Sequence, residues 1–172
     1  MARQSPTGYS RLQIVLHWTI AALVFFQLLV NDGMQRAFDD RMDGSMIEDG
    51  AWAILHIAVG GAVLLLAVVR LGVRLFRGAP PAHDDKPPII NWFGYAVHVL
   101  LYGFIFAMPI TGIVAWFGAS DLAGEIHELG RLVLILIIVL HVIGAFTEHF
   151  YFRNDTLLRM LRPAPRGKPQ DG

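Results

Sequence analysis

His127 and His141 stand fourteen residues apart within one apolar stretch near the end of the chain. In an α-helix, fourteen residues fall about 40° short of four full turns and rise about 21 Å. Both imidazoles would therefore point to the same side at two depths. The nine residues between positions 131 and 141 are all Leu, Val or Ile, which is typical of a helix that crosses a bilayer.

A histidine inside a membrane needs a partner, because an unpaired polar group in hydrocarbon costs several kcal/mol. A pair of metal centres would supply one for each imidazole, and the spacing suits two stacked haems. Two imidazoles on opposite faces of one iron leave no open coordination position, which favours electron transfer over oxygen chemistry at the metal. The chain contains no cysteine, which excludes iron–sulfur clusters, thiolate sites and covalent c-type haem, so any haem is bound non-covalently.

Three further histidines lie near the ends of the other apolar runs, at positions 17, 56 and 98. Their expected depths pair His56 with His127 at an outer level and His17 with His141 at an inner level. His98 competes for the inner level as a weaker candidate ligand and is the better candidate for hydrogen-bonding a quinone. The alternative for any one of them is an ordinary polar residue that packs inside a helix bundle.

Glu148 and His149 follow at the end of the same apolar stretch. Either side chain could relay protons to a reduced quinone, and anchoring of the helix end at the membrane interface is the plainer alternative. Glycines near the histidines, at positions 60, 61, 130 and 144, would let a flat ring approach the backbone, or would serve close helix packing.

The elements that must position these residues are membrane helices. The chain has 172 residues, 55% of them hydrophobic, with a mean hydropathy of +0.50, which is too apolar for a soluble domain of this size. The formal net charge is zero and offers nothing to attract nucleic acid. We expect an all-α, integral membrane four-helix bundle that forms a single domain over residues 1–172, with spans at about 12–30, 51–69, 92–117 and 126–152.

The charges between these spans predict the topology. Residues 31–50, expected to be a connector, carry six acids against two arginines and net −4, whereas the loop over residues 70–91 and the C-terminal tail are basic. By the positive-inside rule, both termini and the loop over residues 70–91 are then cytoplasmic. Within the third span, Pro109 is expected to kink the helix.

Several blocks of the sequence resemble the prokaryotic cytochrome b561 family, the di-haem membrane cytochromes whose best-understood function is superoxide oxidation coupled to ubiquinone reduction. The resemblance rests on the stretches 9–18, 55–56, 69–75, 97–103 with Pro109, 140–141 and 155–160. It implies a multi-pass protein of the bacterial inner membrane with two haem b groups, and a cytoplasmic-side quinone pocket that includes His98. The axial ligands that it implies are His17, His56, His127 and His141.

The acidic connector over residues 31–50 would lie on the outer side of the membrane. Its negative charge would repel an anionic substrate such as superoxide. Superoxide is the first choice of periplasmic donor by family resemblance. The first alternative is an electron-transfer cytochrome that serves a basic periplasmic redox protein or a partner subunit. The second is a carrier in which the histidines bind a transition metal ion or relay protons.

Overall fold

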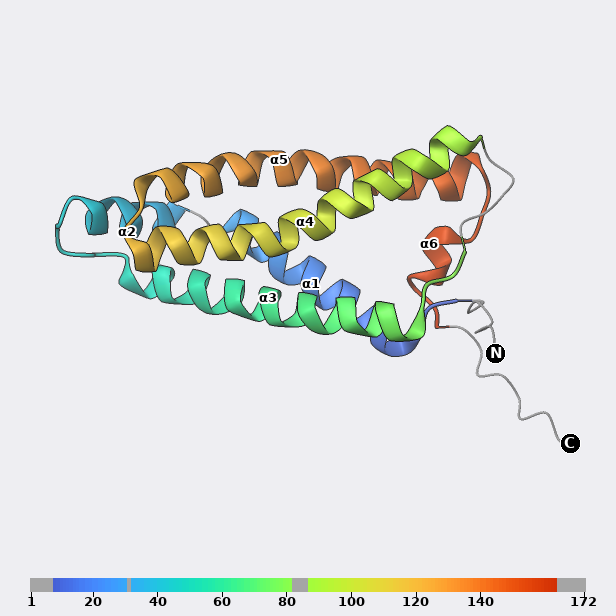
Figure 1. Cartoon of the computed structure of the whole chain (residues 1–172), viewed down its shortest axis with the longest axis horizontal. Helices are drawn as coiled ribbons and strands as arrows, with labels where there is room; N and C mark the ends of the chain where they lie inside the picture. The colour runs from blue at the N-terminus through green and yellow to red at the C-terminus, as the bar shows by residue number, and fades with distance from the viewer. Residues whose placement is uncertain (1–7, 31, 82–86, 164–172) are drawn as a thin grey trace, which may run out of the picture.

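The computed structural model describes residues 8–30, 32–81 and 87–163, and over these residues the chain is helical and contains no strand. Figure 1 shows an elongated bundle of long helices with short helices at its two ends. In chain order the elements are α1 (Arg11–Leu29), α2 (Asp32–Met42), α3 (Gly50–Arg77), α4 (Pro88–Gly118), α5 (Asp121–Phe146), a π-helical turn η1 (Thr147–Tyr151) and α6 (Thr156–Arg159).

Helices α1, α3, α4 and α5 with η1 are long and apolar enough to cross a membrane. Their outer surfaces carry many exposed large apolar side chains, which are stable in contact with lipid but would be costly in water. The predicted all-α membrane bundle with four spans is thus confirmed.

Three of the spans are longer than the predicted ranges. Helix α3 continues past residue 69 to Arg77, because long arginine side chains at a helix end can reach the membrane surface without ending the helix. Helix α4 starts at Pro88, where a proline at the first helical position costs no backbone hydrogen bond. Helix α5 starts at Asp121 and not near residue 126, because the side chain of Ser120 caps it by accepting from the amide of Ala123.

Residues 31–50 connect α1 to α3, and they contain a helix, α2, that the sequence did not predict. This helix is anchored by its small and apolar face: Ala37 is fully buried, and the ring of Phe38 lies against Gly124 of α5. At Gly33 an added Cβ would lie 2.6 Å from the indole of Trp52, so only glycine allows α2 to approach α3 this closely. Helix α2 therefore covers one end of the bundle (Figure 1).

The spans pack in two closely associated pairs. Helix α4 packs along α5, α1 packs along α3, and α3 also contacts α4. Among the described residues, close backbone approaches of α5 to α1 or α3 are few. The space between α5 and these two helices is where the sequence predicts the histidine sites.

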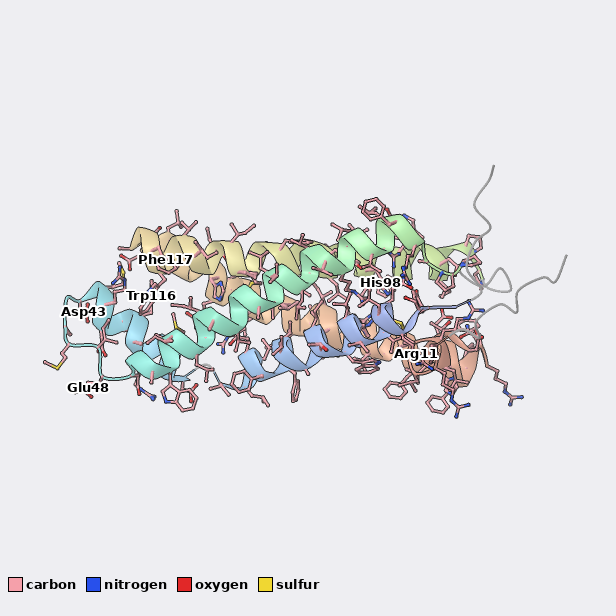
Figure 2. The ribbon with its side chains drawn as sticks, turned by 90° about the horizontal axis from the view of Figure 1, so that it is seen from below. Arg11, Asp43, Glu48, His98, Trp116 and Phe117 are labelled. Atoms are coloured by element: carbon pink, nitrogen blue, oxygen red, sulfur yellow. The ribbon has the colours of Figure 1, made fainter. Side chains whose placement is uncertain are left out.

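The two ends of the bundle differ in their side chains. Figure 2 shows Arg11 and His98 toward one end and Asp43, Glu48 and Trp116 at the other. The start of α1 lies at the same end as α6 (Figure 1), and the indole nitrogen of Trp18 donates to the carbonyl of Met160 at 2.8 Å. We call the end with His98 the inner end and the end with α2 the outer end. The assignment of the inner end to the cytoplasm stays a prediction from charge.

Candidate functional site

Four of the histidines form two pairs, and each pair joins α5 to another helix. The ring centroids of His56 on α3 and His127 on α5 are 6.1 Å apart, with their planes at 67°. Those of His17 on α1 and His141 on α5 are 6.3 Å apart, with their planes at 74°. The two imidazoles of α5 thus share one face at two depths, as the fourteen-residue spacing predicts.

These separations fit one metal ion between the two rings of each pair. An imidazole nitrogen binds a first-row metal at about 2 Å, and a five-membered ring with bonds of about 1.33 Å has its atoms about 1.1 Å from the centroid. Two rings on opposite sides of one ion therefore have centroids about 6.2 Å apart. The observed values agree with this within a few tenths of an ångström, so the residues present fit a bis-histidine haem at each level.

The contact with Thr111 of α4 indicates which nitrogen of the His127 ring carries the proton. The Thr111 hydroxyl lies 3.0 Å from the carbonyl of Ala107 and 2.9 Å from that of Met108, and both of these can only accept. The same hydroxyl lies 3.1 Å from Nδ1 of His127. With its own proton given to a carbonyl, the hydroxyl accepts from Nδ1–H, which leaves the Nε2 lone pair free to bind a metal.

A cavity of about 530 Å³ surrounds the outer pair. Its wall includes both imidazoles, His56 and His127, and the glycines Gly60, Gly61 and Gly112. An added Cβ at Gly112 would lie 3.1 Å from Cε1 of His127, so this glycine brings α4 against the imidazole. At Gly61 an added Cβ would meet nothing within 4 Å, which leaves the α3 wall open to a large flat group.

The outer cavity also contains polar groups of both signs. Four carboxylates line it against one guanidinium, so its ionisable lining is acidic: Asp39, Asp121, Glu125, Glu128 and Arg131. The amide of Gln27 donates to the carbonyl of His56 at 2.8 Å and so holds α1 against α3 at this level. In the described part of the chain, Nδ1 of His56, Oε1 of Gln27 and Nε of Arg131 are buried without a hydrogen-bond partner.

His98 lies beside the inner pair, and its geometry separates it from the axial-ligand candidates. Its ring centroid is 5.0 Å from that of His141, which is about 1 Å too close for a metal ion between the rings. Its Nδ1 lies 2.6 Å from the carbonyl of Gly94, so Nδ1–H donates there and Nε2 is left free. The ring is exposed on the surface of α4. Geometry therefore favours His17 over His98 as the partner of His141.

The last predicted site residues, Glu148 and His149, lie in the η1 turn and contact the segment that follows. The amide of Asn154 donates to the Glu148 carboxylate, and Nδ1 of His149 lies 3.2 Å from the Asn154 carbonyl. The Asn154 side chain also accepts from the amide of Thr156 and so fixes the start of α6. These contacts give both residues a role in ordering the inner end, and proton relay stays a prediction.

Among the residues that the structure describes, no group of three or more His, Asp or Glu side chains is arranged to hold a metal ion. A transported ion bound by protein donors alone would need such a set, because two imidazoles leave most of its coordination positions unfilled. A porphyrin removes the difficulty because it brings four nitrogens of its own.

Four apolar membrane helices with imidazoles paired at two depths define a class of protein, the membrane-bound b-type cytochromes. The family model described as prokaryotic cytochrome b561 matches residues 8–163, and the chain belongs to this family. It is therefore an electron-transfer protein of the cytochrome b561 family, a multi-pass protein of the inner membrane that uses haem b.

Three curated relatives are similar over nearly the whole chain. A protein named cytochrome b562 from Cereibacter sphaeroides is 34% identical over 93% of this chain and 98% of its own length. A protein named probable superoxide oxidase CybB from Yersinia pestis is 27% identical over 92% of this chain and 98% of its own length. Cytochrome b561 homolog 2 of Escherichia coli K12 is 25% identical over 91% of this chain and 93% of its own length.

The sequence reasoning missed Thr111, Gly112 and the cover formed by α2. A threonine three residues after Met108 and two after Pro109 carries no distinctive pattern within an apolar run. Its contact with His127 depends on how α4 packs against α5. No spacing within the sequence predicts that packing.

Proposed function

We propose that this protein carries electrons across the inner membrane, from a periplasmic one-electron donor to the quinone pool, through two haem b groups. The pair His56 and His127 would hold the outer haem and His17 and His141 the inner one. The observation that carries the proposal is the separation of the two ring pairs, 6.1 and 6.3 Å, which suits one iron in each. About 21 Å along α5 separates the two levels.

The topology that goes with this function places the outer end in the periplasm and both termini in the cytoplasm, as the basic loop and tail favour. Residues 1–172 would act as one domain. Bound haem supplies reversible one-electron redox chemistry. The protein supplies the imidazoles, fixes their ring orientation and keeps water from the apolar interior.

At the inner end, the exposed ring of His98 is suited to a lipid-soluble quinone. It lies on the surface of α4, where a quinone can approach from the bilayer, and 5.0 Å from the His141 ring. With Nδ1–H donated to Gly94, the free Nε2 can hold a proton and donate it to a quinone oxygen. Ubiquinone is the acceptor that we propose.

Superoxide is the donor that we place first, supported by the relative named as a probable superoxide oxidase. Each superoxide would lose one electron and leave as dioxygen. Two such electrons, with two protons taken from the cytoplasm, convert one quinone to a quinol. The second candidate, a basic soluble redox protein, is favoured by the four carboxylates in the outer cavity and by the acidic connector before α3.

Stopped-flow reduction of the haem at several ionic strengths tests both donors. With superoxide, we expect haem reduction faster than the background of spontaneous dismutation, and a rate that rises as salt screens the acidic outer end. With a basic soluble c-type cytochrome as the probe, a docking reaction would be fast at low salt and would slow as salt is added. Haem reduction by superoxide no faster than background would exclude superoxide as the donor. The salt dependence of haem reduction by the c-type cytochrome would then decide whether a basic redox protein is the donor.

A variant at the inner end tests the quinone side. His98→Phe should retain both haems, because His98 is too close to His141 to share an iron with it. Re-oxidation of the reduced haems by a ubiquinone analogue should slow at least tenfold, through loss of the proton donor. Unchanged re-oxidation would contradict this role for His98.

A further inference from the structure

A small polar cleft lies at the inner end, apart from the histidine rings. Its walls are formed by Tyr9, Gln13, Arg70, Arg74 and Tyr102, from the N-terminal segment and helices α1, α3 and α4. Its cavity volume is about 10 Å³, which is space for one water-sized polar group. A whole quinone or lipid headgroup does not fit such a space, whereas the end of a carboxylate does.

The two arginines of the cleft are held in place by neighbouring groups. Arg70 donates from Nη1 to the carbonyl of Gln13 at 3.1 Å, and the Gln13 side chain donates to the carbonyl of Gly78 at 2.9 Å. The guanidinium of Arg74 lies over the ring of Tyr102, with Cζ 5.9 Å from the ring centroid. Arg70 keeps further N–H groups for an acceptor, because a guanidinium has five donors.

Tyr102 provides the second observation. Its hydroxyl oxygen is buried and has no hydrogen-bond partner among the described residues. A buried hydroxyl without a partner is costly, and its position in a cleft with two guanidiniums points to an anionic acceptor. Among the residues that the structure describes, no carboxylate lines this cleft.

The cleft lies beside the inner histidine pair. Gln13 is one helical turn before His17 on α1, and Arg70 donates to the Gln13 carbonyl at 3.1 Å, so its guanidinium lies within about one turn of the His17 level. A porphyrin held between these two rings carries carboxylates on its edge. An Arg–carboxylate contact is the strong, geometrically specific form of such an ion pair.

We propose that Arg70, together with the Tyr102 hydroxyl, binds a carboxylate of the inner haem and so sets the orientation and potential of that haem. The proposal rests on the two-haem function above. Arg70 is then a positioning residue, and Arg74 packs on Tyr102 to hold its ring. The positive charge of Arg70 also favours the reduced state of the inner site, because reduction adds a negative charge beside it.

The test uses the full-length protein in detergent with the variants Arg70→Gln, Arg70→Lys and Tyr102→Phe. Arg77→Gln is the matched control, because it removes the same charge from an exposed position of the same helix. The direct measurement is the resonance Raman bending band of the haem propionates, which shifts with hydrogen bonding of the carboxylate. Potentiometric titration and the haem content per chain are measured in parallel.

We expect the propionate band to shift in Arg70→Gln and Tyr102→Phe and to stay unchanged in Arg77→Gln. In Arg70→Gln the reduction equilibrium of the inner haem should fall about tenfold, which is about 59 mV for one electron. Arg70→Lys should recover most of the potential, because it keeps the charge, but should not restore the band. If Arg70→Gln fails to fold, the Lys and Phe variants still decide the question.

An unchanged propionate band in Tyr102→Phe and in either Arg70 variant would overturn the proposal. A free anion such as phosphate, with one oxygen in the cleft, would give this result, since it contributes nothing to a haem band. Wild-type protein with two haems but without quinone reduction would count against the proposed function alone. A shifted band in that same protein would still support the carboxylate contact.

Discussion

The hydrogen bond between Thr111 and His127 gives the sharpest test of the outer site. Thr111→Val replaces the hydroxyl with a methyl of similar size, so it changes the polar contact and leaves packing nearly intact. The Nδ1–H of His127, now 3.1 Å from its acceptor, would lose that partner in a half-buried position. The ring would then be free to turn or to change its tautomer.

The size of the expected loss in haem affinity can be estimated. Removal of a group that orients a metal-binding histidine costs about 10-fold to 100-fold in affinity, which is about 1.4 to 2.8 kcal/mol. A fully buried donor without a partner costs about 1 to 3 kcal/mol, and the half-buried Nδ1–H of His127 should lie toward the lower end of that range. We therefore expect the outer haem to bind 10-fold to 100-fold more weakly in Thr111→Val.

Transfer of haem from the detergent-solubilised protein to excess apomyoglobin measures this effect. The outer haem is identified as the kinetic phase that is missing in His127→Ala. In Thr111→Val this phase should be faster by about 10-fold or more, whereas Thr111→Ser keeps the hydroxyl and should match the wild type. An outer phase with the wild-type rate in Thr111→Val would refute the assigned role of the hydroxyl.

Two glycine substitutions test the packing at the outer end, and a third serves as their control. Gly112→Val should lower outer haem occupancy, measured from the visible spectrum, because even a Cβ here lies 3.1 Å from Cε1 of His127. Gly33→Val should lower the thermal unfolding temperature and expose α2 to protease, because its Cβ would overlap the indole of Trp52. Gly72→Ala is the control: its Cβ meets nothing within 4 Å, so stability should hold or rise by up to about 1 kcal/mol. A stable, protease-resistant Gly33→Val would show that α2 does not depend on this contact.

The sequence predicted the bundle and its histidine pairs for a physical reason. Helical periodicity converts the fourteen-residue separation of His127 and His141 into one face and two depths, and long apolar runs leave few alternatives to membrane spans. The sequence ranked His98 below His17 as the partner of His141 but could not decide between them, because both lie near the same membrane surface. Only the observed separations of 6.3 and 5.0 Å from the His141 ring distinguish them.

Other features depend on tertiary packing. Helix α2 is short and rich in charged residues, and its formation rests on Gly33 and Phe38 fitting against neighbouring helices. The sequence predicted that the second span ends at about residue 69 and that the third starts at about residue 92, whereas Arg70 lies inside α3 and α4 starts at Pro88. Arg70 is tolerated inside α3 because its guanidinium donates to the Gln13 carbonyl of α1. Pro88 is tolerated because the first helical position needs no backbone N–H.

The most direct test of the whole account is a pyridine haemochrome count per chain on purified wild-type protein and two single variants. We expect two haems in the wild type and one in each of His127→Ala and His141→Ala, since each removes one ring of a different pair. A single haem in the wild type, or two haems retained in either variant, would contradict the assignment of one iron to each histidine pair.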